Sequence, residues 1–223
     1  MNEKTRRFLM VNAFLYLIAL LLALKVFDVA VVGPESVRVG LSKVNVWFRN
    51  LWNYGEGMDY SRLWYSIAGI ISYLCMAVCF FWTVLCIRDV IKSGRMDGVG
   101  TDKNLMATFF LYILAVVCYF LLKILKINYG PMILSGKAEL TCSFPSGRVL
   151  LFIVAMGSTA FHVWDLWSEK KKAAVAASVA CVVVMVFGIV AQMICGTNWF
   201  TDTLGSVLLG VTLLSLYSFF FYI

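Results

Sequence analysis

The heptapeptide CSFPSGR places a turn and a cation directly before a long apolar run. Ser143 can cap a helix that starts here, and Pro145 suits its first turn because that turn needs no backbone donor. The N–H groups of Ser146 and Gly147 would then face an anion, together with the positive end of the helix dipole. Arg148 can donate two parallel hydrogen bonds to the same anion. The stretch predicts an oxyanion site, and the simpler interpretation is a capped helix with Arg148 reaching lipid headgroups.

Two further stretches contain groups that could serve the same anion. Lys123 lies near the end of an apolar run, where it supplies a point charge or simply marks the membrane interface. Asn198 and Asp202 are four residues apart and therefore share one face of a helix. Capping by Asn198 and a favourable charge from Asp202 at a helix N-terminus would explain both without chemistry. Asp202 could equally be the counter-ion of Arg148.

The composition places these residues in a membrane protein. Of the 223 residues, 62% are hydrophobic and only 14% are charged, and the mean hydropathy is +0.88, which excludes a soluble globular domain. The net charge of +7 is scattered over short loops, so we expect anionic lipid headgroups and no nucleic acid as partners. A span needs about 20 apolar residues, and six runs meet this condition: 8–31, 64–87, 104–125, 146–167, 173–195 and 201–223.

These runs must be helices, because the bilayer core offers no water to satisfy the backbone. We predict an all-α, polytopic membrane protein whose six transmembrane helices form one integral membrane domain over residues 1–223. Its parts are an amino-terminal span with an outer interfacial helix (1–63) and a core (64–223). Basic residues crowd tight span flanks such as 170–172, so both termini are predicted to be cytoplasmic, in the plasma or bacterial cytoplasmic membrane. The three polar stretches then converge on the outer face.

The outer loop contains LSKVNVWFRNLW, in which apolar residues recur at helical spacing. We expect a helix in the interface plane with its aromatic residues at headgroup depth. It is interpreted as a lid or lipid guide over the bundle, or as an ordinary interfacial helix. Cys142 and Cys195 flank two outer loops, so a disulfide between them is an open alternative.

The order and spacing of the polar motifs resemble the type 2 phosphatidic acid phosphatase superfamily, which includes lipid phosphatases and vanadium haloperoxidases. Its signatures read K-x6-R-P, P-S-G-H and S-R-x5-H-x3-D. Here Lys123 stands at the right separation from Pro131, the Pro-Ser-Gly turn follows, and NWFTDTLGSVLLG resembles the ending of the third signature. The resemblance covers about residues 64–223. It implies a bundle of the six-span phosphatase kind, with its site at the outer face.

The signature positions depart from the family where chemistry is done. The resemblance assigns the attacking histidine to Asn198, its orienting carboxylate to Asp202, the proton donor to Arg148, and two phosphate-binding arginines to Gly130 and Gln192. An amide nitrogen has its lone pair delocalised and cannot form a phosphoenzyme. Arginine has a pKa above about 12, so it is a poor proton donor near neutral pH. The family's phosphohistidine mechanism is therefore predicted to be lost.

The remaining groups suggest binding without cleavage. Lys123, Ser146, Gly147 and Arg148 are predicted to hold a phosphate. The leading hypothesis is a catalytically degenerate relative of membrane lipid phosphatases that binds a phosphorylated lipid headgroup or regulates a membrane protein partner. No cofactor or metal is expected.

Two alternatives remain open. The first is an active lipid phosphatase or phosphotransferase with a non-standard mechanism, in which Asp202 is the nucleophile. The second is a purely structural membrane subunit. The sole histidine, His162, is about 20 Å along the helix from Arg148 and is predicted to be a core or interfacial residue.

Overall fold

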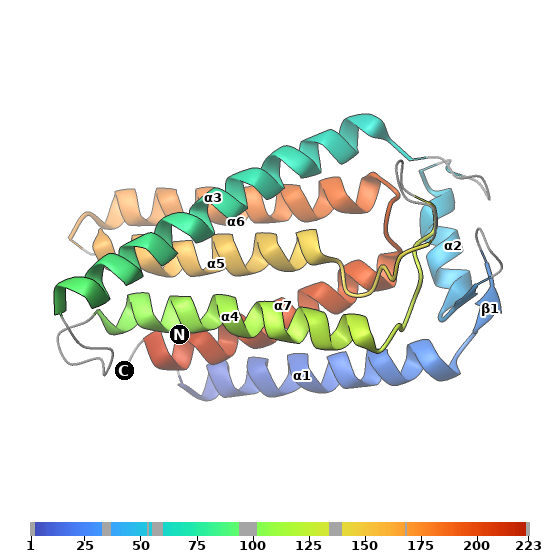
Figure 1. The fold of residues 1–223 in the computed structure, drawn as a ribbon, viewed down its shortest axis with the longest axis horizontal. Coiled ribbons are helices and arrows are strands. Elements are labelled where there is room, and N and C mark those ends of the chain that lie inside the picture. Colours follow the sequence, from blue (N-terminus) through green and yellow to red (C-terminus); the bar gives the residue numbers. More distant parts are fainter. Residues whose placement is uncertain are drawn as a thin grey trace.

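The computed structural model describes residues 3–32, 37–52, 54, 60–93, 102–133, 140–167 and 169–221. Six of its helices are long and apolar enough to cross a membrane, and they run side by side in one bundle (Figure 1). The predicted all-α, six-helix, multi-pass membrane fold is confirmed. The six helices are α1 (Glu3–Val26), α3 (Arg62–Ser93), α4 (Lys103–Ile124), α5 (Gly147–Leu166), α6 (Lys171–Ile194) and α7 (Phe200–Phe221).

The first span differs most from its predicted bounds of 8–31. The helix ends at Val26, and the chain turns at Asp28, which has a φ of 46°. The apolar residues that follow form β1 (Ala30–Val31), which pairs with β2 (Arg38–Val39) in antiparallel register. The Asp28 carboxylate accepts a hydrogen bond from the N–H of Lys43 at 2.6 Å. Hydrophobicity continues through this turn, so the apolar pattern could not locate the helix end.

Helices α5 and α7 form the centre of the bundle, and half of each apolar window is buried. Their contact depends on small residues, since a Cβ on Gly210 would lie 2.6 Å from the side chain of Ile153. Large apolar side chains on the outer helices remain exposed, as lipid-facing surfaces require. The bundle therefore positions the start of α5 against the start of α7.

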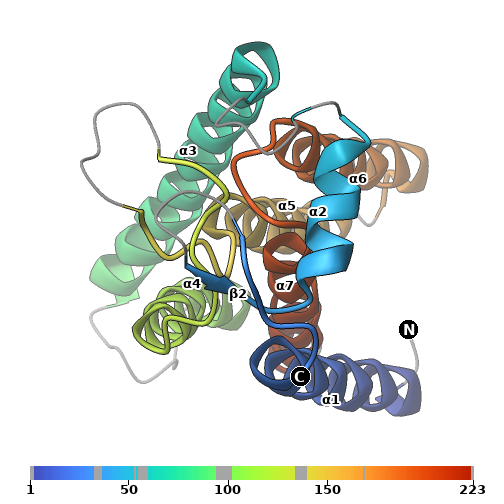
Figure 2. The same ribbon diagram turned by 90° about the vertical axis from the view of Figure 1, so that its right-hand side faces the viewer.

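One end of the bundle is covered by α2 (Ser42–Asn50) and the short β1–β2 ribbon (Figure 2). The helix predicted in this loop is present, with a polar face buried against the protein through Asn45 and Arg49. Val44 and Trp47 on this helix, and Trp52 just after it, are exposed. The start of α1 and the end of α7 lie at the opposite end, together with the end of α3, the start of α4, the end of α5 and the start of α6 (Figure 1).

Candidate functional site

A cavity of about 220 Å³ opens at the end of the bundle that carries α2. Three polar stretches that are far apart in the sequence meet there, as their common sidedness predicted. Among the residues proposed from the sequence, those that line it are Lys123, Gly130, Ser146, Gly147, Arg148, Gln192 and Asn198. The remaining one, Asp202, is not part of the lining. The cavity is also lined by Tyr65 from α3, by Tyr119 from α4, and by Thr197.

The start of α5 differs in detail from the predicted cap. Ser146 is the N-cap residue and its side chain makes no capping bond. Ser143 does not cap the helix, because its hydroxyl donates to the carbonyl of Asn128 at 3.3 Å. The N–H of Ser146 donates to the carbonyl of Asp202 at 3.3 Å, so the prediction that it is free for an anion is wrong. The first-turn amides from Gly147 onward have no intrahelical acceptor, and these provide the anion-binding end.

Gly147 is required by its neighbour in the cavity wall. A Cβ at this position would lie 3.0 Å from the ring of Tyr119. The missing side chain keeps the backbone N–H at the surface of the cavity and lets the ring of Tyr119 pack against it. An oxyanion can therefore approach the helix start closely.

Arg148 projects its guanidinium across the cavity wall. Its Cζ lies 4.2 Å from the centroid of the Tyr65 ring, a cation–π distance. One nitrogen, Nη1, donates to Oε1 of Gln192 at 3.3 Å. Within the described residues this is the one acceptor for its five N–H donors. The stacking fixes the guanidinium plane and leaves most of its donors available to a ligand.

Gln192 and Asn198, which replace an arginine and the attacking histidine of the family signatures, bond to each other. Nε2 of Gln192 donates to Oδ1 of Asn198 at 2.7 Å and to the hydroxyl of Thr197 at 3.0 Å. Nδ2 of Asn198 lies 3.4 Å from the carbonyl of Ser143, to which it donates. Asn198 therefore does not cap α7 as predicted, because Gln192 occupies its acceptor oxygen. Arg148, Gln192 and Asn198 form one continuous hydrogen-bonded chain.

Lys123 and Gly130 also line the cavity. The Lys123 ammonium donates to the carbonyl of Cys142 and lies 5.3 Å from the centroid of the Tyr119 ring. At Gly130 a Cβ would meet no atom closer than 3.6 Å. The Lys123 ammonium is thus held in place. There is room for a Cβ at Gly130, the position where the family signature has an arginine.

Asp202 lies behind the cavity and is 0% exposed. Its Oδ2 accepts from the N–H of Trp199 at 3.0 Å, which confirms a role at the N-terminus of α7. The expected ion pair with Arg148 is absent among the described residues, since Arg148 bonds to Gln192 instead. The Trp199 indole donates to the carbonyl of Tyr129 at 2.7 Å. Asp202 therefore fixes the loop beneath the cavity.

The charge of the cavity favours an anion. Of the described residues that line it, two are cations, Lys123 and Arg148, and none is a carboxylate. A second cavity, about 440 Å³ in volume and almost wholly apolar in its lining, lies between α3, α4 and α5. The two cavities share Tyr119 and Gly147. The arrangement suits an amphiphile with an anionic head and a hydrocarbon chain.

Sequence reasoning missed the residues that support the site from outside the signatures. The guanidinium of Arg49 on α2 donates to the carbonyl of Gly196 at 2.5 Å. The hydroxyl of Tyr54 donates to the carbonyl of Ile194 at 2.7 Å, and burial raises the pKa of this phenol. The residues of α2 do not line the cavity, so α2 braces the loop before α7 and is not a lid over the opening. Aromatic residues at span ends were the one available signal for Tyr65 and Tyr119.

The remaining sequence hypotheses concern cysteine and histidine. Cys142 and Cys195 are free thiols, so the disulfide is not formed. Cys195 is buried with its Sγ 3.1 Å from the carbonyl of Gln192, and Cys142 donates to the carbonyl of Phe144 at 3.4 Å.

His162 is 3% exposed and stacks on Trp82 at 4.0 Å between ring centroids. It is a core residue outside the cavity, as predicted. In the described part of the chain no three His, Cys, Asp or Glu side chains gather as metal ligands.

Comparison with known proteins agrees with this architecture. No protein-family model and no curated protein matches the chain. Its structure is similar to the crystal structure of a transmembrane PAP2-type phosphatidylglycerolphosphate phosphatase from Bacillus subtilis, with a TM-score of 0.68 and 15% sequence identity. The similarity covers 95% of this chain and 94% of that one. The resemblance predicted from the motifs is confirmed at the level of the fold: this chain has the fold of a PAP2-type membrane lipid phosphatase.

Proposed function

We propose that the protein is a catalytically silent relative of membrane lipid phosphatases that binds a phosphorylated lipid headgroup. The observation that carries this proposal is the lining of the 220 Å³ cavity. Among its described residues the cavity combines two cations with an exposed helix start, and it has neither a carboxylate nor a histidine. Such a lining suits phosphate, and it lacks the histidine that attacks phosphorus in the family's mechanism.

Each ligand contact follows from the geometry of the wall. The stacked guanidinium of Arg148 offers a planar pair of donors to two phosphate oxygens. Lys123 supplies a second positive charge, and the N–H of Gly147 lies at the positive end of the α5 dipole. The neighbouring apolar cavity receives part of the hydrocarbon chain. Headgroup recognition therefore depends on charge, and retention in the site depends on the lipid tail.

The absence of turnover rests on the groups that replace the family residues. Asn198 has no nucleophilic lone pair on its amide nitrogen, and a guanidinium is a poor general acid in the place of a histidine. The alternative nucleophile, Asp202, is fully buried and bonded to the backbone of Trp199. An in-line attack needs the nucleophile about 3–3.5 Å from phosphorus. A carboxylate outside the cavity lining does not meet this requirement, so the rearranged mechanism is disfavoured.

We assign the site to the outer face of the membrane, with both chain termini in the cytoplasm. Basic residues at tight span flanks such as Lys171 and Lys172 support this orientation through the positive-inside rule. Regulation of a membrane protein partner is the second form of the proposal, in which lipid occupancy changes how the surface around α2 is presented. Accessibility of single-cysteine variants at Lys43 and Lys171 to a membrane-impermeant maleimide tests the orientation. If only the cysteine at position 171 were labelled in intact cells, the orientation would be the reverse of the one proposed.

Binding is tested by calorimetric titration of detergent-solubilised protein with short-chain phosphatidate. Diacylglycerol with the same chains is the matched ligand that lacks phosphate. We expect phosphatidate to bind and diacylglycerol to show no measurable heat. Equal binding of the two lipids, or no binding of either, would contradict the assignment of the cavity to phosphate.

Turnover is tested by phosphate release from phosphatidate, a prenyl diphosphate and phosphatidylglycerol phosphate. The wild type is compared with a variant that combines R148H, N198H, G130R and Q192R. A Cβ at Gly130 would meet no atom closer than 3.6 Å, and the variant restores the residues of the signatures. We expect no release by the wild type and measurable release by the variant. Release by the wild type that is lost in Lys123→Ala would show an active enzyme and overturn the proposal.

A further inference from the structure

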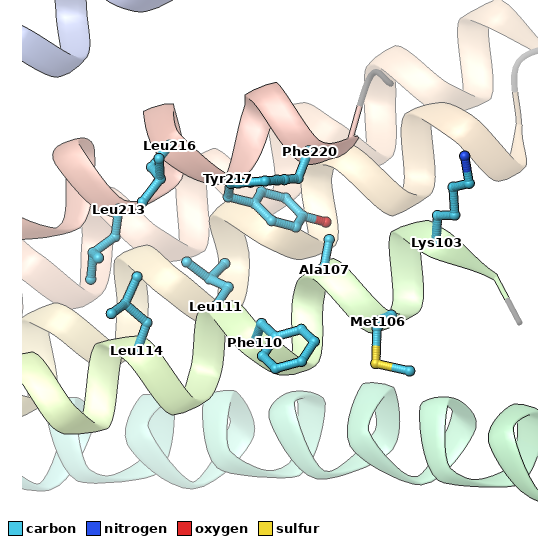
Figure 3. A pocket seen from close by; sticks show the side chains of 10 residues that line it. All are labelled: Lys103, Met106, Ala107, Phe110, Leu111, Leu114, Leu213, Leu216, Tyr217 and Phe220. Carbon is cyan, nitrogen blue, oxygen red and sulfur yellow. The ribbon is translucent and has the colours of Figure 1, made fainter. Parts of the chain in front are cut away.

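A third cavity, distinct from the two described above, lies at the other end of the bundle, between α4 and α7. It measures about 450 Å³ and is lined along most of its length by the side chains of Ala107, Phe110, Leu114, Leu213 and Phe220 (Figure 3). Phe110 and Phe220 are largely exposed, so the groove opens on the lipid-facing surface of the bundle. It shares no residue with the phosphate-binding cavity.

The interior of this groove accepts only hydrocarbon. Apart from Lys103 at one end and Tyr217, its lining side chains are aliphatic, phenyl or thioether groups. The Tyr217 hydroxyl lies 2.8 Å from the hydroxyl of Thr108, a partner on α4, so it is already engaged. A polar ligand would lose its hydrogen bonds to water and gain none here. The part of a ligand that enters the groove is therefore apolar.

The end of the groove is positively charged. Lys103, in the first turn of α4, is exposed and lies at the end of the row of lining side chains (Figure 3). Lys103 is the one charged residue in the lining of the groove, and the nearby carboxylates of Asp102 and Asp165, which accept hydrogen bonds from Asn104, are not part of that lining. Among the described residues Lys103 forms no ion pair. A single cation beside an apolar groove complements an anionic headgroup joined to a hydrocarbon chain.

The length of the groove matches one membrane leaflet. Lys103 and Leu114 mark its ends on α4, and eleven residues at 1.5 Å per residue give about 16 Å. Half of the roughly 30 Å hydrocarbon core is about 15 Å. An acyl chain that lies along α4 from Lys103 thus reaches the bilayer midplane, while its headgroup stays at the interface.

We propose that the α4–α7 groove binds one acyl chain of an anionic phospholipid, whose headgroup contacts Lys103. The lipid belongs to the leaflet opposite the phosphate-binding cavity. This site is separate from the proposed function and does not depend on it, since the two cavities are lined by different residues. A bound lipid in this position joins α4 to α7 where the two helices leave a gap.

The experiment uses full-length protein in phosphatidylcholine vesicles that contain a trace of phosphatidylglycerol with one diazirine-bearing acyl chain. After illumination, mass spectrometry measures labelling of the peptides that cover 103–114 and 213–220. We expect this labelling to fall when unlabelled phosphatidylglycerol replaces an equal amount of phosphatidylcholine, because a specific site saturates. Lys103→Gln should weaken that competition about fivefold, as one basic residue near the surface contributes about that factor for an anionic lipid.

Matched variants separate the site from general membrane contact. Lys92→Gln removes another exposed lysine at the same end of the bundle and should leave the competition unchanged. Ala107→Phe fills the groove and should abolish saturable labelling, whereas Ala176→Phe, on the exposed face of α6, should not. Labelling that does not saturate, or that is unchanged in Ala107→Phe, would overturn the proposal. Equal competition by phosphatidylcholine and phosphatidylglycerol would show a lipid-filled groove without headgroup selection and would also refute it.

Discussion

The two sides of the 220 Å³ cavity have opposite characters. Its front wall, defined as Gly130, Arg148, Gln192 and Asn198, departs from the catalytic signatures at every position. Its rear frame joins the starts of α5 and α7. In that frame the Ser206 hydroxyl lies within hydrogen-bond distance of the carbonyls of Ser146 and Asp202, at 3.0 Å and 2.8 Å. The frame retains the buried polar contacts that hold the two helix starts together.

Under the proposed function, the catalytic side chains are lost while the architecture is kept. The front-wall residues line the cavity, and three of them, Arg148, Gln192 and Asn198, bond to one another, so their replacement changes what the cavity does. Residues of the rear frame satisfy buried backbone groups, and leaving such groups unpaired costs about 1–3 kcal/mol each. A chain that loses its catalytic side chains therefore keeps the fold as long as the frame is intact. Variants in the frame should alter stability, and variants in the wall should alter binding.

The largest effect is expected for Asp202→Ala. The change removes the acceptor of the Trp199 N–H inside the frame, and leaving a buried backbone N–H unpaired costs about 1–3 kcal/mol. We expect the free energy of unfolding to fall by about 2 kcal/mol, seen as a lower midpoint in thermal unfolding in detergent.

Asp202→Asn is the matched control, because the amide oxygen can still accept from Trp199. We expect it to recover most of the lost stability. If Asp202→Ala unfolded at the wild-type temperature, the distinction between frame and wall would not hold.

Arg148→Gln should have the next largest effect, on binding alone. Without the guanidinium, phosphatidate loses a charge-assisted, two-pronged contact, and we expect a weakening of about 30-fold with an unfolding midpoint close to wild type. Arg148→Lys keeps the charge but loses the fork, so it should recover only part of the affinity. Calorimetric titration measures both variants. An unchanged affinity in Arg148→Gln would remove Arg148 from the phosphate site.

The sequence predicted the bundle well because each span is determined by its own composition. The sequence also predicted that Lys123, Arg148 and Asn198 meet in one cavity, because alternate connections of a multi-span bundle lie on the same side of the membrane. The partner of each polar side chain could not be predicted. Asn198 has equal reason to cap a helix or to accept from Gln192, and only the packing of α6 against the loop before α7 decides between them.

The same limit explains the interpretation of α2. Its apolar spacing predicted a helix at the membrane surface, and the structure has that helix. Its buried contacts, however, involve the polar residues between the apolar ones, Asn45 and Arg49. Hydrophobic periodicity carries no information on which polar residues meet the protein. The bracing role therefore had no signal in the sequence.

Asn45→Ala tests this bracing role with a smaller effect. The Asn45 side chain donates to the carbonyl of Gly40 and the hydroxyl of Thr201, and accepts from the N–H of Thr201 at 3.1 Å. We expect a loss of about 1–2 kcal/mol in stability and a modest weakening of phosphatidate binding, because α2 acts on the cavity only through the loop. Asn50→Ala, on the same helix but exposed, is the control. An equal loss in both variants would show that the buried contacts of Asn45 are not the cause.

The smallest effect compares a cysteine in the cavity lining with a buried cysteine outside it, and it needs no mutation. Cys142 lines the cavity, whereas Cys195 is 0% exposed and burial raises the pKa of its thiol. A thiol with a raised pKa has less thiolate at a given pH, so Cys195 should react with a maleimide more slowly than Cys142 at pH 7.5 and gain reactivity only at more alkaline pH.

Phosphatidate at a concentration equal to its dissociation constant fills half the cavities, so it should slow alkylation of Cys142 about twofold and leave Cys195 unchanged. Peptide mass spectrometry after a timed quench measures both sites in one sample. Diacylglycerol is the control ligand. Protection of Cys195 but not of Cys142 would mean that the ligand tightens the frame from a site other than the cavity, and the wall would then have no part in binding.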